Sequence, residues 1–236
     1  MKKVAIHQPQ YFPWLGLLHK ISQCDLFVFL DNVQFARRSF QNRAVYATQQ
    51  GPKYLSIPVS ASNHQIQQVG INSVHFAEPQ EKIRFRHFET LRHRYGRSPG
   101  WNLLKSKLET LMSRNYNTVC DMIIDSMVLT MELFEIKVDF IRASSLKAMG
   151  RKDELILNIT REVGGMTYLS GQGAKAYMRE EIFTDAGIAV EYQTFVHPAY
   201  KQLHGGYFLE GCMAIDFILD DPDSAFAYAK EALWLK

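Results

Sequence analysis

A histidine follows the first apolar run of the chain, where an imidazole could do chemistry. His7 comes directly after residues 4–6, and Gln8 places an amide next to it. Because its charge changes near neutral pH, an imidazole at a strand end is suited to proton transfer or to phosphate binding. We therefore predict that His7 is catalytic, as a general base, and that Gln8 binds the substrate.

Three aromatic side chains crowd the same loop. Tyr11, Phe12 and Trp14 follow His7 within a few residues. Rings of this size dominate ordinary hydrophobic cores, and they also form the floor of pockets for sugars and bases. Both interpretations fit the sequence. The density of rings in one loop leads us to expect that they contact the substrate.

A second polar loop begins at Asp31, after another apolar run, and contains a cluster of arginines. Carboxylate and guanidinium groups bind a phosphate, a carboxylate or one another, so the cluster forms either an anion site or a surface salt-bridge network. Asn42 and Arg43 end the motif just before an apolar run, which favours function for both. At least one of Arg37 and Arg38 is expected to face solvent. We predict catalytic roles for Asp31 and Arg43. The predicted substrate-binding residues of this loop are Arg37, Ser39 and Asn42.

A third loop, residues 170–177, carries two glycines ahead of a predicted helix. Backbone amides in such a turn can cradle an anion, but the spacing matches neither GxGxxG nor a P-loop and is also that of an ordinary loop. Farther along, His197 and His204 are expected at the rim of the pocket. From these segments and the first predicted helix, the expected substrate-binding residues are Lys20, Ser170, Gly171, Tyr177 and Tyr200.

An open, mainly parallel α/β sheet of Rossmann-like layout would position these loops. Residues 4–6 and 25–31 have the apolar runs typical of buried strands. Pro13 is suited to begin a helix that ends near residue 24, because a first-turn proline sacrifices no hydrogen bond. A strand, a helix and another strand recur at residues 138–171, as right-handed crossovers in a parallel sheet require. Ligands bind such sheets at the carboxyl ends of the strands, where the three loops lie.

The middle of the chain has the pattern of a helical subdomain. Apolar residues recur at helical spacing in residues 81–91, 103–112 and 117–134. We predict a helical insert at approximately 80–135 within one domain of residues 1–236. The remaining predicted elements are a hairpin around the Gly51-Pro52 turn, helices at 152–164, 175–187 and 223–234, and a strand at 188–195.

The composition is that of an ordinary globular protein. The chain has 236 residues, 47% of them hydrophobic, and a formal net charge of +3, which indicates no charge-driven binding of nucleic acid. Cys24, Cys120 and Cys212 have no metal-ligand spacing, so we expect reduced thiols and no metal. The apolar run near the N-terminus is too short for a signal peptide or a membrane span. We expect a cytoplasmic protein with a small-molecule substrate.

Three segments of the chain resemble a known family. IHQPQYFPWLG, FVFLDNVQFARRSFQNR and YLSGQGAKAY are similar to the signature segments of the WbqC-like proteins, and the resemblance spans nearly the whole chain. That family is associated with surface polysaccharide, O-antigen and lipopolysaccharide gene sets. The resemblance implies a transferase that moves an acyl or aminoacyl group, for example glycyl, to an amino sugar.

The opening strand, helix and strand also resemble the start of the HxGH nucleotidylyltransferases. This similarity implies a related sheet topology. The turn here reads PWLGL at residues 13–17, so both histidines that would contact the phosphates are absent. The resemblance therefore does not extend to nucleotidyl transfer by the usual mechanism.

Functions of different classes fit these residues. The leading hypothesis is a transferase acting on a nucleotide-linked or lipid-linked amino sugar, with a nucleotide or activated acyl group as donor. In it, Asn42 and Arg43 hold an anionic group and Asp31 orients a partner. The alternatives are a non-catalytic nucleotide- or sugar-binding protein and an ATP-dependent ligase that activates an amino acid. The leading hypothesis requires the imidazole of His7, the guanidinium of Arg43 and the rings to share one cavity.

Overall fold

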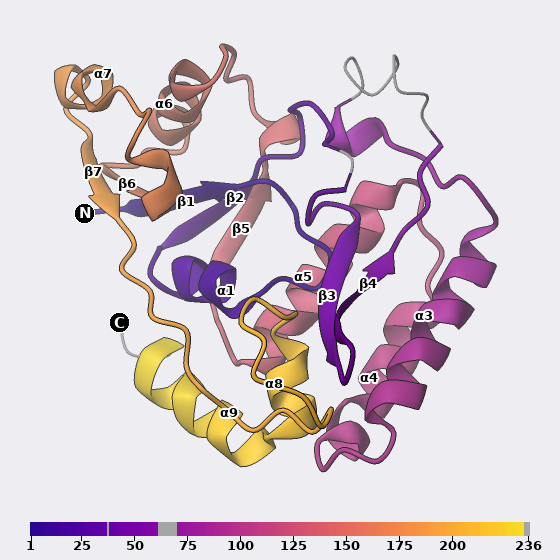
Figure 1. Cartoon of the computed structure of the whole chain (residues 1–236). Helices are drawn as coiled ribbons and strands as arrows, with labels where there is room; N and C mark the ends of the chain where they lie inside the picture. The colour runs from indigo at the N-terminus through magenta and orange to yellow at the C-terminus, as the bar shows by residue number, and fades with distance from the viewer. Residues whose placement is uncertain (37, 61–69, 234–236) are drawn as a thin grey trace.

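The computed structural model describes residues 1–36, 38–60 and 70–233, and it confirms the open α/β sheet. Five parallel strands lie in the order β5-β2-β1-β6-β7 (Figure 1). Every one of them falls on a segment for which a strand is predicted. The strands are β1 Lys3–His7, β2 Leu26–Phe29, β5 Asp139–Arg142, β6 Thr167–Ser170 and β7 Ala189–Tyr192.

The sheet is covered on both faces, because successive side chains of a strand point to opposite sides. Val4 and Ile6 of β1 pack into the core beneath α6 and α7, whereas Ala5 between them packs into the core that contains α1. Figure 1 shows α6 and α7 on one side of the sheet and α1 on the other. This two-sided burial explains the continuous apolar runs of the central strands. The covering helices are α1 Leu15–Ser22, α6 Asp153–Glu162 and α7 Glu180–Asp185.

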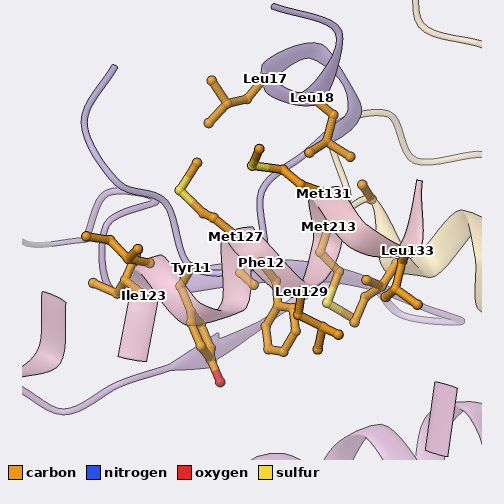
Figure 2. Packing of buried hydrophobic residues seen from close by; sticks show 14 of the residues in the cluster. Tyr11, Phe12, Leu17, Leu18, Ile123, Met127, Leu129, Met131, Leu133 and Met213 are labelled. Atoms are coloured by element: carbon orange, nitrogen blue, oxygen red, sulfur yellow. The ribbon is translucent and has the colours of Figure 1, made fainter. Parts of the chain in front are cut away.

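In the described part of the chain between β2 and β5 lie a hairpin and three α-helices, where a hairpin and three helices are predicted. Gly51 begins the second hairpin strand with φ of +105°, a conformation that favours glycine. The last helix, α5, begins with a capping box between Thr118 and Asp121. Its apolar side packs against α1 and the loop after β1, so the helical segment shares one core with the sheet (Figure 2). The elements are β3 Arg43–Thr48, β4 Gly51–Ser56, α3 Gln80–Tyr95, α4 Trp101–Ser113 and α5 Val119–Leu133.

The helix predicted at residues 175–187 is shorter than expected. A 3₁₀ turn, Gln172–Ala174, precedes it, and α7 begins only at Glu180. The carboxylate of Asp153 accepts hydrogen bonds from the backbone N–H and Nε of Arg179 at 3.3 Å and 3.4 Å. These bonds hold Arg179 against α6, and α7 begins at the next residue, Glu180.

The last predicted helix, residues 223–234, is also different, and residue 234 lies outside the described part of the chain. The structure has α8 Ile215–Asp220, which the sequence analysis missed, then α9 Pro222–Tyr228 and a π-helical turn Ala229–Leu233. Pro222 has no N–H with which to continue α8, and the Asp221 side chain caps α9 instead. Pro222 therefore separates α9 from α8, and α9 begins one residue before the predicted helix.

The buried core predicts the cost of truncating its rings. Phe27 on β2 is fully buried, whereas Phe85 on α3 is 67% exposed. We expect Phe27→Ala to lower the free energy of unfolding by about 3–5 kcal/mol, because it leaves a cavity in a packed core. The matched Phe85→Ala should change it by less than about 0.5 kcal/mol. Urea unfolding measures both, and equal effects would contradict the described packing.

Candidate functional site

A cavity of about 770 Å³ opens between the carboxyl ends of β1 and β6. The chain leaves β1 toward β2 on one side and leaves β6 toward β7 on the other, so the two loops diverge here. In open α/β sheets such a switch point is where ligands bind. The predicted site residues that line it are His7, Gln8, Lys20, Ser170, Gly171 and Tyr177.

His7 lines this cavity as a neutral imidazole. A carbonyl oxygen can only accept, so the 2.8 Å contact between Nδ1 and the Gln8 carbonyl oxygen places the proton on Nδ1. Nε2 then carries a lone pair, and no donor from the described residues is bonded to it. Burial and the nearby Lys20 ammonium lower the pKa of His7 from 6.5 to about 4. At neutral pH the side chain is therefore neutral, and its unprotonated Nε2 is a weaker base than that of an ordinary histidine.

Lys20 brings a buried cation to the same cavity. The residue is 4% exposed, and its Nζ donates to the Ile6 carbonyl oxygen at 2.9 Å. Among the residues that the structure describes, no carboxylate forms an ion pair with it. Burial lowers the pKa of Lys20 to about 8, so the ammonium is charged at neutral pH. A buried charge without a counter-ion is costly, and an anionic ligand would relieve that cost.

The loop after β6 forms one wall of the cavity. Ser170 contributes a hydroxyl that donates to the Gly171 carbonyl oxygen at 3.4 Å and also interacts with the Tyr168 phenol. A Cβ built on Gly171 or Gly173 would meet no atom within 4 Å, so the loop leaves open space beside its backbone. Tyr177 is 72% exposed, as expected of a ring at the mouth of a cavity.

The remaining lining includes residues that the sequence analysis missed. Lys152 and Asp153, at the start of α6, and Tyr168 on β6 face the same cavity. Burial raises the pKa of Tyr168 to about 12, so its phenol stays protonated. The sequence does contain a signal for Lys152 and Asp153. A helix that follows a parallel strand begins at the edge of the sheet where the strands end. The predicted helix at 152–164 therefore already placed residues 152 and 153 near the site.

Asp31 has a structural position. It is fully buried, and its two carboxylate oxygens accept from the backbone N–H and Oγ of Ser144 at 2.8 Å and 2.7 Å. Its backbone oxygen accepts from the N–H of Asn72. These bonds tie the end of β2 to the turn after β5, and Asp31 is not part of the cavity lining.

The aromatic residues of the first loop pack away from the cavity lining. Tyr11 and Phe12 are buried in the core against α5, as Figure 2 shows. Phe12 has φ of +41°, which turns the chain at this point. The Trp14 ring lies over Gly16, where a Cβ would come within 2.2 Å of it, and packs edge-on against Phe195. The first turn of α1 is therefore covered by an indole.

Arg43 and Asn42 line a separate cavity of about 340 Å³ beside the hairpin. The Arg43 guanidinium lies 4.4 Å from the centre of the Tyr54 ring, and the Asn42 amide donates to the Ile57 carbonyl oxygen at 2.9 Å. Ser39 donates to a carbonyl in its own loop. Arg37 lies outside the described residues. The expectation that imidazole, guanidinium and rings share one cavity does not hold, because β3 carries Arg43 away from the ends of β1 and β2.

The residues predicted at the rim of the pocket, His197, Tyr200 and His204, do not line this cavity either. Tyr200 is 9% exposed, stacks on Phe217 at 4.1 Å and donates to Asp216 at 2.8 Å. His197 stacks beside it. His204 lines a third cavity, of about 660 Å³, between the hairpin and α3. These residues fasten the C-terminal segment to the core.

Two properties of the described residues concern metal ions and membranes. Within residues 1–36, 38–60 and 70–233, no group of three or more histidine, cysteine or acidic side chains is placed to hold a metal ion. None of the helices in that part of the chain has the length and apolar character needed to cross a membrane. Cys24, Cys120 and Cys212 are buried.

The unpaired charge of Lys20 predicts a gain in stability on its removal. Because its pKa falls from 10.5 to about 8 on folding, the unfolded chain binds more protons between these values, and the penalty is fully present below pH 8. We expect Lys20→Met to raise the free energy of unfolding at pH 7 by about 1–3 kcal/mol, after loss of the Ile6 bond. The gain should shrink as the pH rises from 8 toward 10.5.

Urea unfolding at pH 7 and pH 9.5 measures this difference. The exposed Lys107 on α4 provides the control, and Lys107→Met should change stability by less than about 0.5 kcal/mol at either pH. A less stable Lys20→Met protein at pH 7 would show that the ammonium is compensated in the free protein.

Comparison with known proteins agrees with the sequence resemblance. The model of the WbqC-like protein family matches residues 8–228. The uncharacterized protein Rv1507c of Mycobacterium tuberculosis is 25% identical over 217 residues, which cover 88% of this chain and 89% of the relative. No solved structure matches the chain. The match over residues 8–228, which is most of the chain, shows that this chain belongs to the WbqC-like protein family.

Proposed function

We propose that this protein transfers an acyl or aminoacyl group, for example glycyl, to the amine of a nucleotide-linked or lipid-linked amino sugar in surface polysaccharide biosynthesis. The observation that carries the proposal is a neutral imidazole and an unpaired buried ammonium lining one cavity. The cavity, about 770 Å³, has the size of small-molecule sites. Family membership supports the substrate class through the resemblance described above.

Acyl transfer to an amine requires a base that accepts a proton from the nitrogen, and a cation would bind an anionic group of the substrate. The amine nitrogen of the sugar attacks the carbonyl carbon of the donor, and a tetrahedral intermediate forms. Nε2 of His7 takes the proton that the nitrogen must lose, and the leaving group departs with the electron pair of the bond that breaks. Lys20 holds an oxyanion of the substrate, a phosphate or a carboxylate. The carbonyl carbon ends bonded to nitrogen, and no oxidant or reductant is needed.

A covalent intermediate on Cys120 or Cys212 has no support in this structure. Burial raises the pKa values of Cys120 and Cys212 to about 12. The thiolate is the nucleophilic form, so these two side chains are inert at neutral pH. Direct attack by the amine is therefore the route that the described side chains favour.

Replacement of His7 tests its role as the base. We expect His7→Ala and His7→Gln to lower kcat by about 10²–10⁴, with a smaller effect on KM, because a positioned base acts in the transition state. The assay combines amino-sugar nucleotides with activated glycyl donors and detects the product by mass spectrometry. The control is His75→Ala, at an exposed histidine outside the cavity lining. Wild-type rates in both His7 variants would sink the proposal.

The pH dependence of kcat/KM gives an independent check. His7 must be neutral, so activity should fall as the pH drops through its pKa of about 4. Lys20 must be charged, so activity should fall as the pH rises through its pKa of about 8. We expect a plateau between pH 5 and pH 7.5, and Lys20→Met should remove the alkaline decline together with most of the affinity for the anionic substrate.

The alternative from another class is a protein that binds a nucleotide or sugar without turnover. The indole over the first turn of α1 favours it over an ATP-dependent ligase, because it closes the helix start where phosphates would bind in an HxGH enzyme. Thermal shifts with single ligands would look alike for the binder and the transferase. Product formation with two substrates together distinguishes them.

A further inference from the structure

A chain of hydrogen bonds fixes the orientation of the Gln8 amide. A backbone N–H can only donate, so its 2.8 Å contact from Ala36 identifies the acceptor on Gln41 as the oxygen Oε1. The other end of the Gln41 amide is then Nε2, which donates to Oε1 of Gln8 at 2.8 Å. The Gln8 oxygen is thereby occupied, and its NH₂ group is the end that remains.

The remaining NH₂ group belongs to the cavity. Gln8 lines it, and its Nε2 donates to no acceptor among the described residues. Gln41 is 2% exposed and lies behind Gln8, outside the cavity lining. Lys20 of the same lining has donors beyond the one spent on Ile6. The cavity thus offers an amide NH₂, an ammonium and the acceptor nitrogen of His7.

We infer that Gln41 is a positioning residue that turns the Gln8 amide so that its NH₂ group, together with the Lys20 ammonium, binds an oxyanion of the substrate. The inference rests on the proposed function for the identity of that substrate, and on the two hydrogen bonds of the Gln41 amide for the polarity of the site. It also gives Gln41 a part in the site, because Gln41 connects Ala36 to Gln8 of the cavity lining. If the Gln41 amide were reversed, the Gln8 oxygen would face the anion and repel it.

We call the hydrogen bonds from Ala36 to Gln41 and from Gln41 to Gln8 the relay. A carboxyl group at position 41 makes the direction of this relay depend on pH. In Gln41→Glu the protonated carboxyl can accept from the Ala36 N–H and donate to the Gln8 oxygen, as the amide does. The ionised carboxylate can only accept, so Gln8 must turn its NH₂ group toward it and its oxygen toward the cavity. Burial raises the pKa of such a carboxyl above its usual value, which brings the change into a convenient range.

Sulfate is the probe, because it keeps its charge from pH 5 to pH 7.5, where Lys20 stays charged and His7 neutral. We expect wild-type protein to bind sulfate equally across this range. Gln41→Glu should match it at pH 5 and lose about 10- to 100-fold in affinity as the pH rises, since a hydrogen bond to a charged group is lost. NMR titration measures the affinities, and a parallel titration with acetate distinguishes a phosphate-like from a carboxylate-like preference.

Two further variants separate the relay from a general structural effect. Gln41→Met removes both bonds without a titrating group, so its loss of sulfate affinity should be the same at every pH. Gln10→Glu places a carboxyl at another buried glutamine of the first loop, which has no bond to Gln8. We expect less than a threefold change with pH in that control.

Several outcomes would overturn the inference. They are no sulfate binding by the wild type, no pH transition in Gln41→Glu, or an equal transition in Gln10→Glu. If Gln41→Glu does not fold, hydrogen exchange of the wild-type Gln8 amide protons decides, because sulfate should slow it and leave the Gln41 amide unchanged. Loss of transfer activity in every substrate combination, with the sulfate pattern intact, would refute the proposed function and leave the relay standing.

Discussion

The buried charge of Lys20, which no carboxylate of the described residues pairs with, governs the chemistry of the site. Within that part of the chain its ammonium has one hydrogen-bond partner, the Ile6 carbonyl oxygen, and lies 5.9 Å from the centre of the Tyr168 ring. Such a group is tolerated only where the rest of the core is stable enough to carry the cost. Here that core is the two-sided sheet, and the order of its strands sets β1 beside β6 and opens the cavity that the charge faces.

The same charge shapes its neighbours. It adds to burial in keeping His7 neutral, so a base and a cation coexist in one cavity without forming a pair. Asp153, an acidic residue of the same lining, pairs with Arg179 and not with Lys20. Asp31, outside the lining, accepts hydrogen bonds from Ser144. Asp216 accepts from Tyr95 and Tyr200, which fastens α8 to α3 and to the C-terminal segment.

Trp14 and Gly16 pack together at the first turn of α1, beside the place where many α/β proteins bind an anion. The indole occupies the space over the first turn of α1, and only a residue without Cβ fits beneath it. The N–H groups of a helix start are an anion site in many α/β folds, whereas here those of Leu17 and Leu18 donate to the Trp14 carbonyl oxygen and the indole packs beside Gly16. The cation of the cavity, Lys20, lies on α1 beyond its first turn, and other polar groups of the lining lie at the ends of β1 and β6.

The strands, most of the helices, the position of His7 at a strand end and the family can be read from the sequence, because they depend on local patterns of apolar residues and on long motifs. Three features follow only from the packing of the folded chain: Tyr11 and Phe12 turn into the core, Asp31 binds Ser144 far along the chain, and Arg43 lies beside the hairpin in a separate cavity. Residue types do not encode which strands become neighbours or which way a loop side chain points. Those choices follow from packing between segments distant in sequence, and they gathered His7, Lys20 and the loop after β6 into one cavity.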